Sequence, residues 1–317
     1  MAVAARRLAS AGVEPARVEA ELLVAHVLGV PRGRLALADP LDPDQLARLG
    51  ELVDRRTARE PLQHLTGLAP FRHLELAVGP GVFVPRPETE LLAGWGIDRA
   101  RAATGDTPAR PGGDVTGEAG GPLVVDLCSG SGAIALAVAH EVPSARVVAV
   151  ERSPAALAWL RRNTAERTAA GERPVTVVAA DVTDPDLLTD PDLLADLVGT
   201  VDVLLCNPPY VPRSVGVPPE VGGHDPAQAV FAGADGLEVI RPLVAVAARL
   251  LRPGGVVGVE HDDTHGLAVP ELLAADGRFT AVAGHRDLAG RPRYATASRR
   301  SDARDAAADL TWQTSSS

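Results

Sequence analysis

The chain has 317 residues, contains two cysteines and no lysine, and carries a formal net charge of −10. This length allows about two domains, and so few cysteines exclude a small secreted domain held together by disulfides. No apolar run is long enough to span a membrane, and the acidic balance disfavours a protein that grips nucleic acid, which usually has a basic face. We therefore expect a cytoplasmic, monomeric protein that contacts neither membrane nor nucleic acid.

Residues 1–62 are predicted to form a small helical domain. Apolar side chains from Val18 to Leu28 repeat at helical spacing. Gly29 with Pro31 just beyond it predicts the end of that helix. A further helix is expected from about Asp42, and no strand pattern occurs in this part of the chain.

Residues 63–87 are predicted to be a β-hairpin connector. Residues 64–67 and 74–78 alternate between apolar and polar side chains, and residues 79–81 read Gly-Pro-Gly, which favours a turn. We expect a β-hairpin or an extended connector here, with the turn leading into residues 82–84 before the chain enters its larger domain.

Residues 88–300 show the alternation of strands and helices that is typical of an α/β fold. A helix is predicted at 88–103 and a flexible, Gly- and Pro-rich loop at 104–121. The predicted strands are 123–127, 146–150, 175–179, 201–206 and 255–259, with 279–283 and 293–298 as the last two. Apolar strands alternating with helices predict a parallel sheet covered on both faces. The tail, 301–317, is expected to be disordered.

A glycine-rich turn follows the first of these strands, between Asp126 and the next helix. It contains Cys128, Ser129, Gly130, Ser131 and Gly132. Glycines let the backbone approach a ligand, and the helix start offers free N–H groups. The turn suits either S-adenosylmethionine or a nicotinamide dinucleotide, although Ala135 stands where the dinucleotide motif has its third glycine.

Carboxylates lie at the ends of the first three strands of the expected sheet. Asp126 is placed to meet the amino end of a methionine moiety, and Glu151 to accept ribose hydroxyls. Asp181 ends the third strand and is expected to receive an adenine amino group, with Val182 lining the ring. Either cofactor needs the ribose carboxylate, so Glu151 does not separate them.

The fourth strand runs directly into the tetrapeptide Asn207-Pro208-Pro209-Tyr210. Ligands bind at the carboxyl ends of the strands of an open α/β sheet, so the tetrapeptide is expected beside the glycine turn. The Asn207 side-chain oxygen and the Pro208 carbonyl can accept both N–H bonds of a planar NH2 group. The prolines stiffen the loop and offer no competing N–H, and Tyr210 can pack on the planar group. We expect methyl transfer from S-adenosylmethionine to such a nitrogen.

With these residues in view, the chain resembles the HemK-type release-factor glutamine methyltransferases over nearly all of residues 1–295. The resemblance rests on the unchanged tetrapeptide and on three further segments: residues 84–90, which read Val-Pro-Arg-Pro-Glu-Thr-Glu, residues 233–237 and residues 287–291.

The resemblance implies a helical substrate-recognition domain and a Rossmann-like, seven-stranded class I methyltransferase sheet. It implies transfer of a methyl group from S-adenosylmethionine to the glutamine of the Gly-Gly-Gln motif of peptide chain release factors. The cofactor would contact residues 128–132, Glu151, Val182 and Asn207, and residues 207–210 would hold the glutamine. Some positions depart from the family: Cys128 replaces a frequent glycine, Glu151 a usual aspartate, Val182 a common aromatic and Asp225 a usual glutamate.

Other functions remain as alternatives. A nucleic-acid amino methyltransferase, acting on N6 of adenine or N2 of guanine, would use the same tetrapeptide. A nicotinamide-dependent oxidoreductase or a cofactor-binding module without catalysis would need only the glycine turn. Residues 260–263, Glu-His-Asp-Asp, resemble a metal cluster, but adjacent side chains at a strand end diverge. We expect no metal, and we expect Cys128 and Cys206 to be two separate thiols.

Overall fold

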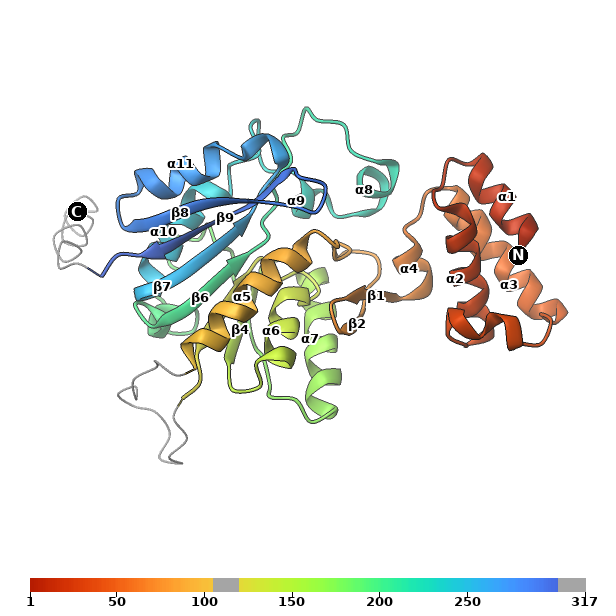
Figure 1. The fold of residues 1–317 in the computed structure, drawn as a ribbon, viewed down its shortest axis with the longest axis horizontal. Helices are drawn as coiled ribbons and strands as arrows, with labels where there is room; N and C mark the ends of the chain where they lie inside the picture. The colour runs from red at the N-terminus through yellow and green to blue at the C-terminus, as the bar shows by residue number, and fades with distance from the viewer. Residues whose placement is uncertain (105–119, 302–317) are drawn as a thin grey trace.

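The computed structural model describes residues 1–104 and 120–301 of the chain. The first part is helical and is set apart from the sheet in Figure 1. Its helices are α1 (Ala2–Ser10), α2 (Ala16–Leu28), the 3-10 helix η1 (Arg32–Leu37) and α3 (Pro43–Thr57). They pack around a core that includes Leu8, Leu23 and Leu52.

The predicted ends of these helices are confirmed. Gly29 closes α2 with φ of 66°, a left-handed conformation that glycine adopts readily. Asp42 caps α3, since its side chain accepts from the Gln45 N–H and the Gln45 side chain accepts from the Asp42 N–H. This reciprocal capping satisfies donors that would otherwise lack a partner.

The connector contains α4 (Leu62–Thr66) and an antiparallel pair, β1 (Leu68–Phe71) and β2 (Leu74–Ala77). The prediction that residues 64–67 are extended is wrong. They form most of α4 and its left-handed Gly67 end, and the adjacent His64 and Leu65 are both buried, which an alternating strand would not allow.

The hairpin turn also differs from the prediction. It lies at Arg72 and His73, not at residues 79–81. Arg72 has φ of 51°, and its guanidinium is held by the Glu141 carboxylate at 2.5 Å. The Glu141 carboxylate that anchors Arg72 lies far away in the sequence, so the local sequence could not predict this turn.

The predicted α/β sheet is confirmed as seven strands in the order β5-β4-β3-β6-β7-β9-β8. Its strands are β3 (Leu123–Leu127), β4 (Arg146–Glu151), β5 (Thr176–Ala179), β6 (Val201–Cys206), β7 (Leu251–Glu260), β8 (Phe279–Arg286) and β9 (Pro292–Arg299). The first five in this order, β5 to β7, run parallel, and β9 is antiparallel to both of its neighbours.

Helices cover both faces of the sheet (Figure 1). The helices of this part are α5 (Thr89–Ala103), α6 (Ala133–Glu141), α7 (Pro154–Ala169), α8 (Pro219–His224), α9 (Ala227–Val230), α10 (Ile240–Leu250) and α11 (Ala268–Ala275), with 3-10 turns η2 (Ala195–Leu197) and η3 (Asp263–His265). Two apolar clusters, one on each face, bury the strands. The sequence did not predict α11.

Strand order reverses between β3 and β6, because β4 and β5 lie on one side of β3 and β6 and β7 on the other. In such a sheet the ligand crevice opens at the carboxyl ends of the strands beside this reversal. The tetrapeptide and the glycine turn follow those two neighbouring strands, so the topology brings them together.

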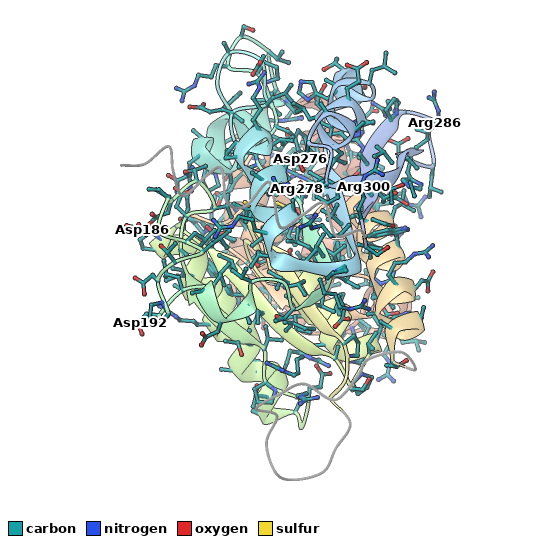
Figure 2. All side chains as sticks on the ribbon, turned by 90° about the vertical axis from the view of Figure 1, so that its left-hand side faces the viewer. Asp186, Asp192, Asp276, Arg278, Arg286 and Arg300 are labelled. Atoms are coloured by element: carbon teal, nitrogen blue, oxygen red, sulfur yellow. The ribbon has the colours of Figure 1, made fainter. Side chains whose placement is uncertain are left out.

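Figure 2 views the molecule from the left-hand side of Figure 1. Asp276, Arg278 and Arg300 gather in this view, with an Asp276–Arg278 ion pair at 2.7 Å and an Arg300 N–H that donates to the Arg278 carbonyl at 2.8 Å. The backbone bond joins the residue just before β8 to the residue just after β9. The predicted loop 104–121 and tail 301–317 lie almost wholly outside the described residues.

Candidate active site

A cavity of about 330 Å³ lies at the carboxyl ends of β3, β4, β6 and β7. All but one of the residues predicted to form the site line it. Those residues are Asp126, Cys128, Ser129, Gly130, Ser131, Glu151, Asp181, Val182, Asn207, Pro208, Pro209 and Tyr210. Gly132 is the exception, since it does not line the cavity.

The glycine turn contains three residues in the left-handed backbone conformation. Cys128, Gly130 and Gly132 have φ of 61°, 56° and 89°, a region that disfavours side chains other than hydrogen. A Cβ on Gly130 would meet nothing within 4 Å, so this backbone is open to a ligand. A Cβ on Gly132 would lie 2.6 Å from the Leu160 side chain, so Gly132 permits close packing of α7 and starts α6.

Glu151, at the end of β4, is held by two backbone amides. The N–H of Gly130 donates to one carboxylate oxygen at 2.9 Å, and the N–H of Ser153 donates to the other at 2.7 Å. Glu151 therefore ties the glycine turn to the next strand. Each carboxylate oxygen can accept a further bond, which suits a ligand with vicinal hydroxyls.

Asp126, at the end of β3, is buried and only half satisfied. Its Oδ2 accepts from the Ala135 N–H at 3.1 Å, whereas its Oδ1 is buried with no hydrogen-bond partner in the described part of the chain. Burial, with a smaller contribution from the Glu151 charge, raises the pKa of Asp126 to about 7. An ammonium group beside Oδ1 would supply the missing partner.

Asp181 follows β5, lines the cavity and already has several hydrogen-bond partners within the protein. Its carboxylate accepts from Arg152 at 2.9 Å and from the backbone and hydroxyl of Thr183. Partial burial raises the pKa of Asp181, but the hydrogen bonds from Thr183 and Arg152 outweigh it and lower the pKa. Val182 is buried and lines the wall beside it.

The tetrapeptide is fixed by residues on other elements. The Asn207 Nδ2 group donates to the Thr89 hydroxyl at 3.1 Å. No partner for Asn207 Oδ1 occurs in residues 1–104 and 120–301, so this oxygen is left as an acceptor. The Tyr210 hydroxyl donates to Glu260 Oε1 at 3.0 Å, and burial together with that carboxylate raises the pKa of Tyr210.

Among the lining residues that the sequence did not predict, three interact with the tetrapeptide: Thr89, Glu260 and Arg293. From the sequence, residues 260–263 are interpreted as a loop lining the mouth of the active site and not as a metal site, and Glu260 is given no role. Glu260 ends β7 next to the strand that carries the tetrapeptide, and the strand-end rule that selected Glu151 would have selected it too. The Asp262 side chain instead accepts from the Thr264 backbone N–H at the start of η3.

The segment after the tetrapeptide forms one wall of the cavity through α8 and α9. Arg86 holds this wall by an ion pair with the fully buried Asp225 side chain at 2.6 Å. Arg56 and Arg59 of the helical part bind Glu220 of α8 at 3.0 and 2.7 Å. The residues 84–90 thus reach the site twice, through Arg86 and through Thr89.

The segment 287–291 turns between β8 and β9 and orients Arg293. The Asp287 carboxylate accepts from the Ala289 and Arg291 N–H groups and from the Arg293 guanidinium at 3.1 Å.

Cys128 and Cys206 are free thiols, and burial raises the pKa of Cys206 well above its usual range. In the described residues no group of three or more His, Cys, Asp or Glu side chains could hold a metal ion, and no helix could cross a membrane.

Two family models match the chain: the PrmC N-terminal domain over residues 1–67 and the methyltransferase small domain over residues 118–216. A release factor glutamine methyltransferase from Mycolicibacterium smegmatis is 50% identical over 292 residues, which cover 92% of this chain and 94% of that protein. The Streptomyces coelicolor protein of the same name is 50% identical and covers 94% and 96%. A 4-amino-L-phenylalanine/4-methylamino-L-phenylalanine methyltransferase from Streptomyces pristinaespiralis is 39% identical and covers 86% of both chains.

Proposed function

The chain belongs to the release factor glutamine methyltransferase family, and from that premise we propose how its cavity performs the reaction. The protein transfers a methyl group to the side-chain amide nitrogen of a release-factor glutamine. The observation that supports this function best is the orientation of the Asn207 amide. Its Nδ2 donates to the Thr89 hydroxyl, so its Oδ1 is available to accept a hydrogen bond from the substrate. Release factors act in translation termination, so we propose that the enzyme works in the cytoplasm.

We propose that S-adenosylmethionine binds between the glycine turn and the tetrapeptide. The residues fit it: the unpartnered Asp126 Oδ1 suits the methionine ammonium, Glu151 the ribose hydroxyls, and Asp181 with Val182 the adenine. Residues 128–132 would supply backbone contacts through Gly130, with Gly132 acting through packing. When bound, this cofactor supplies an electrophilic methyl group.

The tetrapeptide prepares the acceptor nitrogen. An amide nitrogen is a weak nucleophile because its lone pair is delocalised into the carbonyl. Asn207 Oδ1 and the Pro208 carbonyl would accept its two N–H bonds, which fixes the nitrogen and favours the positive charge that develops on it. Pro209 keeps the loop rigid, and Tyr210 packs on the planar group. Such positioning lowers a barrier by roughly 7–11 kcal/mol in favourable cases.

The test is a labelling assay with radioactive S-adenosylmethionine. Purified protein should label an intact release factor and leave unlabelled a variant in which the Gly-Gly-Gln glutamine is alanine. RNA, DNA and free 4-amino-L-phenylalanine serve as competing acceptors. Labelling of any of these in preference to the release factor would overturn the proposed substrate.

We also propose that the helices of residues 1–62 recognise the body of the release factor. The ion pairs from Arg56 and Arg59 to Glu220 join these helices to the cavity wall, so a protein bound there would lie beside the tetrapeptide. In the same assay, a short Gly-Gly-Gln peptide should show a much higher KM than the whole factor. An equal KM would remove the helices from recognition.

S-Adenosylmethionine affinity is expected to depend on pH through Asp126. Burial raises its pKa to about 7, and an ammonium at Oδ1 would favour the carboxylate, so binding below that pKa must release a proton. The dissociation constant should therefore fall by up to about tenfold per pH unit as pH rises toward 7, then level off. Calorimetry in buffers of different ionisation enthalpy measures the released proton.

Asp126→Asn is the matched control for this proton release. It keeps an oxygen for the Ala135 N–H but cannot ionise, so its affinity should be weaker and independent of pH over this range. The same proton release in the variant would assign it to another group.

A further inference from the structure

Glu260, the last residue of β7, is a buried carboxylate that has no role in the proposed mechanism. Glu260 is 1% exposed and lines the cavity, and its preceding residue pairs with Cys206 in the sheet. Glu260 is therefore level with Asn207 on the neighbouring strand. A buried carboxylate is costly unless it is paired or hydrogen-bonded, so its surroundings call for an explanation.

Glu260 has one firm partner and one available oxygen. Oε1 accepts from the Tyr210 hydroxyl at 3.0 Å, and Oε2 is buried with no hydrogen-bond partner in the portion of the chain that is described. The Thr89 hydroxyl lies beside this carboxylate and, with the Tyr210 hydroxyl, lowers its pKa, although burial dominates and raises it to about 7. Arg293 and Glu88 are the other charged groups that act on it.

Thr89 connects Glu260 to Asn207. Its oxygen accepts from Asn207 Nδ2 at 3.1 Å, which leaves its single proton to be donated elsewhere. An ionised carboxylate can only accept, so the unpartnered Glu260 Oε2, once ionised, is placed to take the Thr89 proton, which would leave the Thr89 lone pairs for Asn207. The negative charge of an ionised Glu260 would then fix the direction of both hydrogen bonds, from Thr89 to Glu260 and from Asn207 to Thr89.

We propose that Glu260 and Thr89 are positioning residues that set which way the Asn207 amide faces. With Nδ2 bound to Thr89, Oδ1 is presented to the substrate NH2. A flipped amide would present an NH2 group to another NH2 group, which leaves donors facing donors and no acceptor for the substrate. Through Tyr210, the same carboxylate also fixes the ring that packs on the substrate amide. This inference rests on the proposed function, because it assigns Glu260 to the same reaction.

Thr89→Val and Thr89→Ser test the inference as a matched pair. Valine keeps the shape of threonine and removes the hydroxyl, whereas serine keeps the hydroxyl. Thr89→Val should lower kcat by about 10- to 100-fold, as expected for the loss of a hydrogen bond that orders a buried polar group. Thr89→Ser should stay within about threefold of wild type, and both should keep the wild-type KM and S-adenosylmethionine affinity.

Glu260→Gln should lower kcat by a similar factor, because its NH2 group can donate to Thr89 and reverse the bond direction. If the two residues act as one chain, the double variant Thr89→Val with Glu260→Gln should be no slower than the slower single variant. Wild-type kcat in Thr89→Val and Glu260→Gln, or equal losses in Thr89→Ser and Thr89→Val, would overturn the inference.

A second measurement needs no substrate and detects misfolding. The Asn207 side-chain NH2 gives a pair of ¹H–¹⁵N NMR signals, assigned by their absence in Asn207→Asp. In wild type, the proton held by Thr89 should exchange slowly with water, and in Thr89→Val it should exchange at least about tenfold faster while the backbone spectrum is retained. Unchanged exchange would also overturn the inference.

The two levels of failure are distinguishable. If wild type labels no release factor but labels another NH2 acceptor, the proposed substrate is wrong, and the variants are then compared on that acceptor, because Thr89 and Glu260 act on Asn207. If wild type labels the release factor and the variants label it equally fast, only the positioning role is wrong.

Discussion

Asn207→Ala is expected to lower kcat for methyl transfer to a release factor by on the order of 10² or more. Alanine removes the Asn207 amide oxygen and leaves the Pro208 carbonyl to hold the substrate NH2 alone. With one acceptor, the nitrogen can rotate out of line with the methyl group. Single-turnover labelling at saturating cofactor measures the effect on the chemical step, and calorimetry checks how much cofactor affinity is retained.

Asn207→Asp is the control for this change. It retains an oxygen acceptor and loses the NH2 that donates to Thr89. Its rate should therefore lie between wild type and Asn207→Ala. An unchanged rate in Asn207→Ala would remove Asn207 from the mechanism, and an equal loss in both variants would show that the Thr89 contact matters more than the acceptor.

The sequence predicted the sheet well because its strands are apolar runs that depend little on distant residues. The run 201–206 became β6 with all six residues buried. The grouping of the strand-end residues around one cavity followed from the same pattern, because parallel strands bring their carboxyl ends to one edge. Alternation failed at residues 64–67, where a short helix buries two adjacent side chains.

Contacts between distant segments could not be predicted from local pattern. Thr89 reaches Asn207 across 118 residues of sequence, and Arg86 reaches Asp225 across 139. The resemblance identified residues 84–90 as a family segment without saying what they do. The structure supplies the physical reason: Arg86 in this segment holds the cavity wall through Asp225, and Thr89 holds the Asn207 amide.

Gly236→Ala is expected to destabilise the protein and slow the enzyme together. Gly236 has φ of 76°, and a Cβ there would lie 2.3 Å from the Tyr210 carbonyl oxygen and 2.7 Å from the His265 ring. The left-handed conformation alone costs an alanine about 1–2 kcal/mol. The clash adds to this, because the nearest atom is backbone and cannot rotate away. We expect a loss of about 3 kcal/mol or more in the free energy of unfolding.

Gly277→Ala separates the two contributions. Gly277 has φ of 78°, and a Cβ there would meet nothing within 4 Å, so this variant should lose only the conformational part and keep wild-type kcat. Gly236→Ala should lose more stability in denaturant unfolding and should also lower kcat, since relief of the clash must move Tyr210. Equal losses in the free energy of unfolding of the two variants would show that the backbone at Tyr210 shifts at little cost to accommodate the added Cβ. A larger loss of stability and of kcat in Gly236→Ala would mean that residues 233–237 contribute to the site by close backbone packing against Tyr210. This packing would explain why the family resemblance includes a segment that has no catalytic side chain.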